Sequence, residues 1–148
     1  MRNFLVKFIA SCGFVGYIPF APGSWISLLV LILIWFWQPS LPLFLIFILV
    51  SFFGGVIIAS TAERIWEHDS GKIVIDEFLG MLVALFLLPH KLLFYGLSLI
   101  LFRFFDIVKP LFIRKLEKLP SGWGVMADDL LAGIYANLVV QILVLILP

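Results

Sequence analysis

Long apolar runs, separated by short polar or proline-containing stretches, make up the hydrophobic pattern of this chain. No charged residue lies between Lys7 and Glu63, although glycines and prolines interrupt residues 13–24. Apolar runs bounded by prolines and charged residues are typical of membrane helices. The pattern predicts helices over residues 25–37, 41–62, 76–88, 92–108 and 130–147.

The ends of these helices carry their own signals. Ser24 is a predicted N-cap for the first helix, because its side-chain oxygen can accept a hydrogen bond from a free backbone N–H group. Pro39 and Pro42 separate the first two helices, and Pro89 ends the third. Residues 13–24 are too rich in glycine and proline for one straight helix, so we expect a short surface or membrane-dipping segment followed by a loop.

The composition indicates that these helices lie in a membrane. Hydrophobic residues make up 64% of the 148 and charged residues only 13%, whereas roughly 25% of a typical soluble domain is charged. The mean hydropathy is +1.21. We therefore expect an all-α, multi-pass membrane protein in which residues 1–148 form one domain with about five membrane helices. Residues 25–37 and 76–88 would each reach only ~20 Å as helix, so they draw in flanking residues or insert without fully crossing.

The charged residues gather on one side of the predicted topology. If the N-terminus is cytoplasmic and five helices cross, residues 1–24, 63–77 and 103–129 all face the cytoplasm. Nine of the ten basic residues then lie there, with Lys91 as the exception, in agreement with the positive-inside bias. All nine acidic residues lie there too, although acids have little effect on topology. Their common location indicates a shared polar site at that membrane face.

Each candidate residue of that site also has an ordinary structural explanation. The acidic pairs Asp76–Glu77 and Asp128–Asp129 are predicted at helix starts, where the helix dipole and free N–H groups favour carboxylates. Arg103 and Asp106 are spaced i, i+3 and could form a local ion pair. His68 could lie in a solvated turn.

Taken together, the same residues predict a site for a divalent metal. Asp76, Glu77, Asp128 and Asp129 supply the oxygen ligands that hard cations such as Mg²⁺ prefer. The sequence has no cluster of cysteine and histidine suited to zinc, since Cys12 is its single cysteine. A net charge of +1 argues against nucleic acid as a partner. The candidates for holding phosphate are basic side chains and a turn at a helix start, namely Arg103, Lys109, Lys72, Gly23 and Ser24.

Five short motifs occur in an order that spans nearly the whole chain. They are Gly16–Ser24, His68–Asp69, Ile73–Gly80, Phe102–Pro110 and Gly122–Gly133. In this ordered set the chain resembles the phosphatidylglycerophosphatase A family of bacteria. Two places depart from the family pattern. The usual P-G-T-x-G-S carries Ser24 in place of threonine and Ile26 in place of the second glycine, and Ser70 replaces the proline after His-Asp.

The resemblance implies a multi-pass enzyme of the bacterial inner membrane with its active site facing the cytoplasm. Members of the family look all-helical and are Mg²⁺-dependent lipid phosphatases. They remove the terminal phosphate from phosphatidylglycerophosphate to give phosphatidylglycerol. The expected substrate of this chain is therefore a lipid phosphate monoester.

Roles for the candidate residues follow from the expected reaction. We expect metal ligation chiefly by Asp76 and the Asp128–Asp129 pair, with Glu77 and Asp106 as further ligands or as a base. The remaining roles go to basic side chains: Arg103 and Lys109 neutralise phosphate charge, and His68 protonates the leaving alkoxide. Either water or an aspartate carboxylate could be the nucleophile.

Two other classes of function could use the same carboxylates. An ion or solute transporter would place them near the bilayer midplane, and the interrupted segment 13–24 is a feature of such proteins. A non-catalytic membrane scaffold would use them only to cap helices. The clustering of the acids at helix ends on one side favours a phosphatase over both.

Overall fold

A computed structural model describes residues 2–66 and 70–147 of the chain. Every regular element within these residues is helical, which confirms the predicted all-α fold. The elements in chain order are α1 (Arg2–Ala10), the 3₁₀ helix η1 (Val15–Tyr17), α2 (Pro22–Trp37), α3 (Leu41–Trp66), α4 (Ile75–Leu85), α5 (Leu92–Val108), α6 (Ile113–Leu116) and α7 (Gly122–Ile146).

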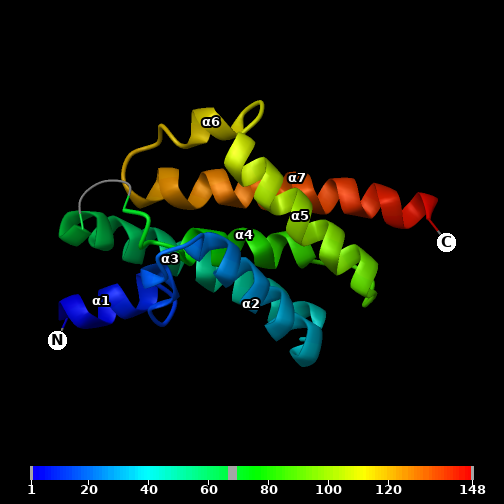
Figure 1. The fold of residues 1–148 in the computed structure, drawn as a ribbon, viewed down its shortest axis with the longest axis horizontal. Coiled ribbons are helices and arrows are strands. Elements are labelled where there is room, and N and C mark those ends of the chain that lie inside the picture. Colours follow the sequence, from blue (N-terminus) through cyan, green and yellow to red (C-terminus); the bar gives the residue numbers. More distant parts are fainter. Residues whose placement is uncertain (1, 67–69, 148) are drawn as a thin grey trace.

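Helix α4 lies in the middle of the bundle and packs against α7, α2, α3 and α5 (Figure 1). Its backbone comes closest to that of α7. A Cβ atom at Gly133 would overlap the Gly80 carbonyl oxygen, and one at Gly80 would overlap the Phe102 ring. Small residues permit this close approach between helices. The crossing of α4 and α7 therefore brings side chains on these two helices within reach of one another.

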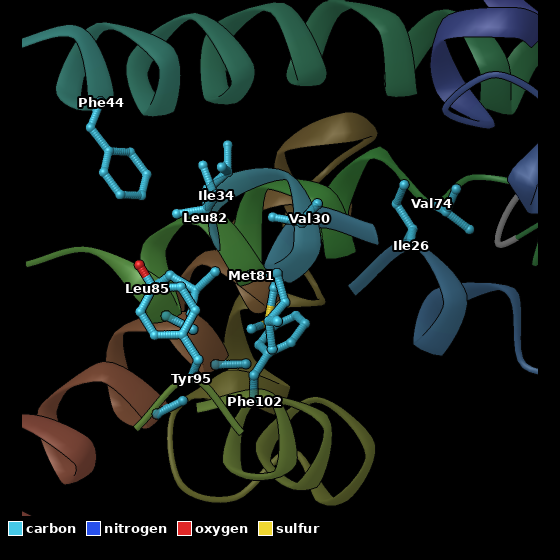
Figure 2. Close-up of a cluster of buried hydrophobic side chains, with 14 of the residues drawn as sticks. Ile26, Val30, Ile34, Phe44, Val74, Met81, Leu82, Leu85, Tyr95 and Phe102 are labelled. Carbon is cyan, nitrogen blue, oxygen red and sulfur yellow. The ribbon is translucent and has the colours of Figure 1, made fainter. Parts of the chain in front are cut away.

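A large apolar cluster fixes the positions of α2, α4, α5 and α7. Figure 2 shows Val30 and Ile34 of α2 beside Leu82 of α4, and Phe102 of α5 near Met81. A second cluster joins α1, α3 and α4 to α7. Full burial of each large side chain contributes about 1.5–3 kcal/mol. These clusters hold the helix ends that carry the polar residues.

Helix α2 begins earlier than the sequence pattern predicts. It starts at Pro22 instead of Trp25, and Ala21 occupies the N-cap position in place of Ser24. Proline suits the start of a helix because its φ angle is already helical and its missing N–H group would have no helical partner there. The predicted N-cap at Ser24 is therefore wrong, and this residue lies within the first turn.

Three further helix ends differ from the prediction by more than one residue, whereas the bounds of α5 agree with it. Helix α3 continues to Trp66, four residues beyond the predicted end at Ala62. Helix α4 stops at Leu85, before Pro89 is reached, and Phe86 is extended. Helix α7 begins at Gly122, which places Asp128 inside the helix instead of at its start.

Polar side chains from two other helices bind the carbonyl groups at the end of α4. Ser98 Oγ donates to the Ala84 carbonyl oxygen at 2.8 Å. Asn137 Nδ2 donates to the carbonyl oxygens of Ala84 at 3.1 Å and of Phe86 at 2.7 Å. The last carbonyls of a helix have no partner within it and are costly to leave unpaired in an apolar setting. These contacts allow α4 to end inside the bundle.

Helices α3 and α7 are the two in the described residues that are long and apolar enough to cross a membrane. With 26 and 25 residues they each extend ~38 Å, more than a hydrocarbon core of ~30 Å. Helices α2, α4 and α5 have 16, 11 and 17 residues. The expected number of about five membrane helices is therefore not supported, because three of the apolar runs form shorter helices.

Candidate metal and phosphate site

A polar pocket of about 390 Å³ lies where α2, α4 and α7 begin and where α3 and α5 end. Its walls come from the three segments that the charge pattern predicts on one side of the membrane. Its charged lining residues are Glu63, Asp76, Glu77, Arg103, Asp106, Lys109, Glu117, Asp128 and Asp129.

Three carboxylates in this pocket converge on one point. Asp76 and Glu77 come from the first turn of α4 and Asp129 comes from α7. Each offers an oxygen atom, and these oxygens lie within 4.8 Å of one another. Among the described residues, Asp76 Oδ1, Glu77 Oε2 and Asp129 Oδ2 are buried and have no hydrogen-bond partner. Buried acceptors without partners are costly, so their arrangement fits a bound cation.

Arg103 of α5 lies beside this triad and contacts two acids. Its Nη1 is 2.6 Å from Asp106 Oδ2 on the same helix and 3.8 Å from Glu77 Oε1 on α4. The i, i+3 ion pair considered from the sequence is therefore present, and it also faces the pocket. The buried Nε of Arg103 has no acceptor among the described residues. This N–H group can donate to an anion.

Lys109 connects the end of α5 to α7 through a second set of ion pairs. Its Nζ is 2.7 Å from Asp128 Oδ2 and 3.0 Å from Glu117 Oε1. Burial alone would lower the pKa of Lys109, but the hydrogen bonds and charges of Asp128 and Glu117 outweigh it and raise that pKa. The ammonium group is thus held in its charged form, with one of its three N–H donors beyond these two contacts.

Gly23 brings the start of α2 against the acidic cluster. A Cβ atom at this position would overlap the Glu77 carboxylate and lie 3.0 Å from Arg103 Nη1. Only a residue without a side chain allows this approach. The backbone of α2 therefore forms one wall of the pocket at the predicted residue.

Of three further residues with predicted roles, one is not described and two do not line the pocket. His68 lies outside the described residues. Ser24 is absent from the lining, and its N–H group donates to the Ala21 carbonyl oxygen at 3.0 Å. Lys72 Nζ lies 5.4 Å from the centre of the Tyr17 ring and is likewise absent from the lining. The predicted phosphate contacts of Ser24 and Lys72 have no support in this geometry.

The position of the aspartate pair in α7 removes capping as its explanation. The helix begins at Gly122, so Asp128 and Asp129 lie beyond the first turn, where N–H groups have helical partners. Both residues are almost completely buried, with 4% and 3% of their surface exposed. Burial of carboxylates is costly unless charge partners compensate for it. For Asp76 and Glu77, in the first turn of α4, stabilisation by the helix dipole still applies.

Glu63, Glu117 and Ser121 also line the pocket, although the motifs did not single them out. Glu63 and Glu117 belong to the nine acidic residues on one side of the predicted topology, and that pattern was a usable signal. Ser121 has no such signal in the sequence. Its backbone, with φ 55°, leads directly into α7.

The pocket carries much more negative than positive charge, with seven acidic and two basic side chains among the described residues. A phosphate ester is itself an anion, so this lining would repel it unless a cation were bound. Burial raises the pKa of Asp76 well above its usual range, and the charges of Glu77 and Asp129 raise it further. The donors of the triad are all oxygen atoms, a set that suits a hard divalent cation such as Mg²⁺.

Comparison with known proteins gives a consistent result. The chain matches the family model of phosphatidylglycerophosphatase A over residues 8–144. It is 43% identical over 130 residues to phosphatidylglycerophosphatase A of Haemophilus influenzae, covering 84% of this chain and 80% of the relative. It is 34% identical over 124 residues to phosphatidylglycerophosphatase A of Escherichia coli, covering 80% and 72%.

A third relative has a different name. A protein of Bacteroides thetaiotaomicron, whose name proposes a phosphatidylinositol-3-phosphatase, is 35% identical over 143 residues and 86% of each chain is covered. No solved structure matches this chain. The family match covers all the residues that line the pocket, and we conclude that the chain belongs to the phosphatidylglycerophosphatase A family.

Proposed function

We propose that this protein hydrolyses the terminal phosphate of phosphatidylglycerophosphate, giving phosphatidylglycerol and inorganic phosphate, with Mg²⁺ as cofactor. Family membership and the names of the Haemophilus influenzae and Escherichia coli relatives support the reaction. The observation that carries the proposal is the triad of Asp76, Glu77 and Asp129, whose unpaired oxygens converge in a pocket of excess negative charge.

These three side chains are the proposed metal ligands. A bound divalent cation would polarise the phosphoryl group and position or activate the attacking water. Of the two acids expected as ligand or base, Glu77 is the better ligand, because Asp106 is already paired with Arg103 at 2.6 Å. Asp128 is likewise paired with Lys109 at 2.7 Å. We therefore propose that Asp106 positions the Arg103 side chain and that Asp128 positions the Lys109 side chain.

The two basic side chains are the proposed phosphate contacts. Arg103 has a buried Nε donor that finds no acceptor in the described part of the chain, and Lys109 has a third N–H donor beyond its two ion pairs. Charge-assisted hydrogen bonds from such groups are stronger than neutral ones. They would stabilise negative charge as it redistributes over the phosphate oxygens in the transition state.

We place the protein in the bacterial inner membrane with the pocket facing the cytoplasm. In the most apolar stretch of α3 only 17% is buried inside the protein, and in the corresponding stretch of α7 only 28% is buried. A core helix of a soluble protein would be mostly buried, so these faces are suited to lipid. The basic residues at the pocket end of the bundle favour the cytoplasmic side for it.

A second substrate class is suggested by the Bacteroides thetaiotaomicron relative. Phosphatidylinositol 3-phosphate and phosphatidylglycerophosphate are both phosphate monoesters carried on a glycerophospholipid headgroup. The triad would act on the phosphate monoester group that the two lipids share. Phosphate release from the two lipids under identical conditions would determine which one this chain prefers.

The test of the proposal is phosphate release by purified protein in detergent micelles containing phosphatidylglycerophosphate and Mg²⁺. We expect the Asp76→Asn and Asp129→Asn variants to lose activity by about a hundredfold or more, since a bound cation contributes several kcal/mol to the transition state. A chelator should abolish wild-type activity. The control is Lys91→Met, which removes a charge outside the pocket and should leave activity unchanged. Near-full activity of both aspartate variants, correctly folded, would refute the assignment.

A further inference from the structure

A second cavity, almost entirely apolar, lies on the other side of the first turn of α4. It has a volume of about 520 Å³ and runs between α1, α2, α3 and α4. Its walls include Phe8 and Ile9 of α1, Ile26 of α2 and Phe78 of α4. We call this cavity the apolar groove.

Two helices contribute residues to both the apolar groove and the polar pocket. In α4, Asp76 and Glu77 line the pocket, whereas Ile75 and Phe78 line the groove. In α2, Gly23 lines the pocket, and Ile26 lies three residues further along on the same helix face and lines the groove. Three residues of α2, a rise of ~4.5 Å along the helix axis, therefore separate the polar end from the start of the apolar part.

The α3 side of the apolar groove is built to leave space. Its residues extend from Phe47 to Ile58, a distance of ~16 Å along the helix axis. This is close to half of a hydrocarbon core of ~30 Å. A Cβ atom at Gly54 would meet nothing within 4 Å, so this glycine faces the open space. Gly55 instead packs against Met126 of α7 and closes the back of the groove.

The Cys12 thiol, which lines the apolar groove, already has a hydrogen-bond partner. The Cys12 thiol is 3.8 Å from the Val74 carbonyl oxygen, to which it donates. Burial, together with the Glu77 charge, raises the pKa of Cys12 to about 12, so the thiol is neutral at physiological pH. The groove thus offers apolar surface without a charge to attract a polar ligand.

We propose that the apolar groove holds one acyl chain of the lipid whose phosphate is bound in the polar pocket. This inference rests on the proposed function, because that substrate joins a phosphate headgroup to acyl chains through glycerol. Such a lipid needs a charged site for its headgroup and, close beside it, an apolar channel that extends about as deep as one leaflet of the bilayer. The pocket and the groove provide this arrangement, and Gly54 sets the width available to the chain.

The experiment compares Gly54→Leu with the matched control Gly96→Leu. Gly96 lies on α5 away from the groove, and its Cβ would also meet nothing within 4 Å. Each variant is assayed with dioleoyl and with dihexanoyl phosphatidylglycerophosphate. We expect Gly54→Leu to lose about tenfold in kcat/KM for the dioleoyl lipid, the loss that follows when about two methylene groups are displaced from apolar surface. Its activity on the dihexanoyl lipid, and both activities of Gly96→Leu, should match the wild type.

A second measurement reports on the apolar groove without requiring turnover. A phosphatidylglycerophosphate with a photoreactive diazirine in the middle of one acyl chain should label residues 47–58 and α1 in the wild type. Gly54→Leu should reduce that labelling. Labelling confined to the outer face of α5 would overturn the proposal.

The remaining outcomes separate this proposal from its alternatives. Equal losses on both lipids, or no loss on either, would show that the groove does not hold the acyl chain. Dissociation of an oligomer by Gly54→Leu, measured by mass in detergent, with equal loss on both lipids, would instead assign the groove to a second copy of the chain. If the wild type hydrolyses neither lipid but the groove is labelled, the phosphatase proposal fails and the groove proposal stands.

Discussion

Arg103 is the basic residue that directly faces the triad, and its geometry depends on the guanidinium group. One nitrogen contacts acids on two helices, Asp106 at 2.6 Å and Glu77 at 3.8 Å, while Nε is left for another acceptor. A lysine ammonium is a single point charge and cannot distribute its donors in this planar arrangement. Charge alone is therefore insufficient at this position.

Replacing Arg103 with lysine tests this point. We expect Arg103→Lys to reduce kcat/KM for phosphate release by about ten- to a hundredfold, equivalent to one or two charge-assisted hydrogen bonds. The matched control is Arg114→Lys, because Arg114 is exposed and, among the described residues, its side chain makes a single 3.5 Å contact with the Val108 carbonyl oxygen. Equal activity of the two variants would contradict the assigned role of Arg103.

At the scale of single residues, the sequence identified which side chains share the pocket better than it identified their partners. Asp76, Arg103 and Asp129 could be singled out because charges are rare in an apolar chain. The pairing of Lys109 with Asp128, at 2.7 Å, could not be predicted. It depends on how the end of α5 meets α7, which is a property of tertiary packing.

At the scale of helices, α4 depends on α7 for the satisfaction of its last carbonyl groups. Asn137 binds two of these carbonyls, and Gln141, one turn further along α7, contacts the carbonyls of Phe86 and Leu87 at 3.4 and 3.3 Å. Since the first turn of α4 carries Asp76 and Glu77, these contacts anchor the opposite end of the helix that presents two metal ligands.

Replacing Asn137 with leucine should therefore destabilise the fold. The side chain is similar in size, but two hydrogen bonds are lost, which together contribute about 1–3 kcal/mol. The Ala84 carbonyl then keeps only its bond from Ser98, and the Phe86 carbonyl only its longer contact with Gln141. Thermal unfolding in detergent should show a clearly lower Tm. Gln141→Leu should have a smaller effect, because its contacts are longer and the one with the Leu87 carbonyl is exposed. An unchanged Tm for Asn137→Leu would contradict the role assigned to these hydrogen bonds.

Helix boundaries were predicted correctly where prolines flank the helix, and incorrectly where glycines serve helix packing instead of a turn. Helix α5 lies between two prolines, Pro89 and Pro110, and its predicted bounds hold. Gly122 and Gly124 look like a turn in the sequence, but both are buried inside α7. A Cβ at Gly122 would overlap the α3 backbone at Val56. The glycine is needed for helix packing, and a single sequence does not distinguish that need from a turn.

At the scale of the whole molecule, the ends of α2, α3, α4, α5 and α7 line one acidic pocket at one pole of a largely apolar protein. The distribution of charge along the sequence predicted which segments meet there. This distribution did not predict the number of spanning helices. In α4, for example, the apolar stretch of the sequence is longer than the helix that it forms. The proposed function requires this pole to bind a divalent cation.

Direct binding of Mn²⁺, a spectroscopic probe for Mg²⁺, tests that claim without a substrate. Electron paramagnetic resonance of purified protein in detergent should show bound Mn²⁺ that excess Mg²⁺ displaces. Asp129→Asn should weaken binding by about tenfold or more, since it removes one of three carboxylate ligands, while Lys91→Met should bind like the wild type. Unchanged Mn²⁺ affinity in folded Asp129→Asn and Asp76→Asn would contradict the metal site.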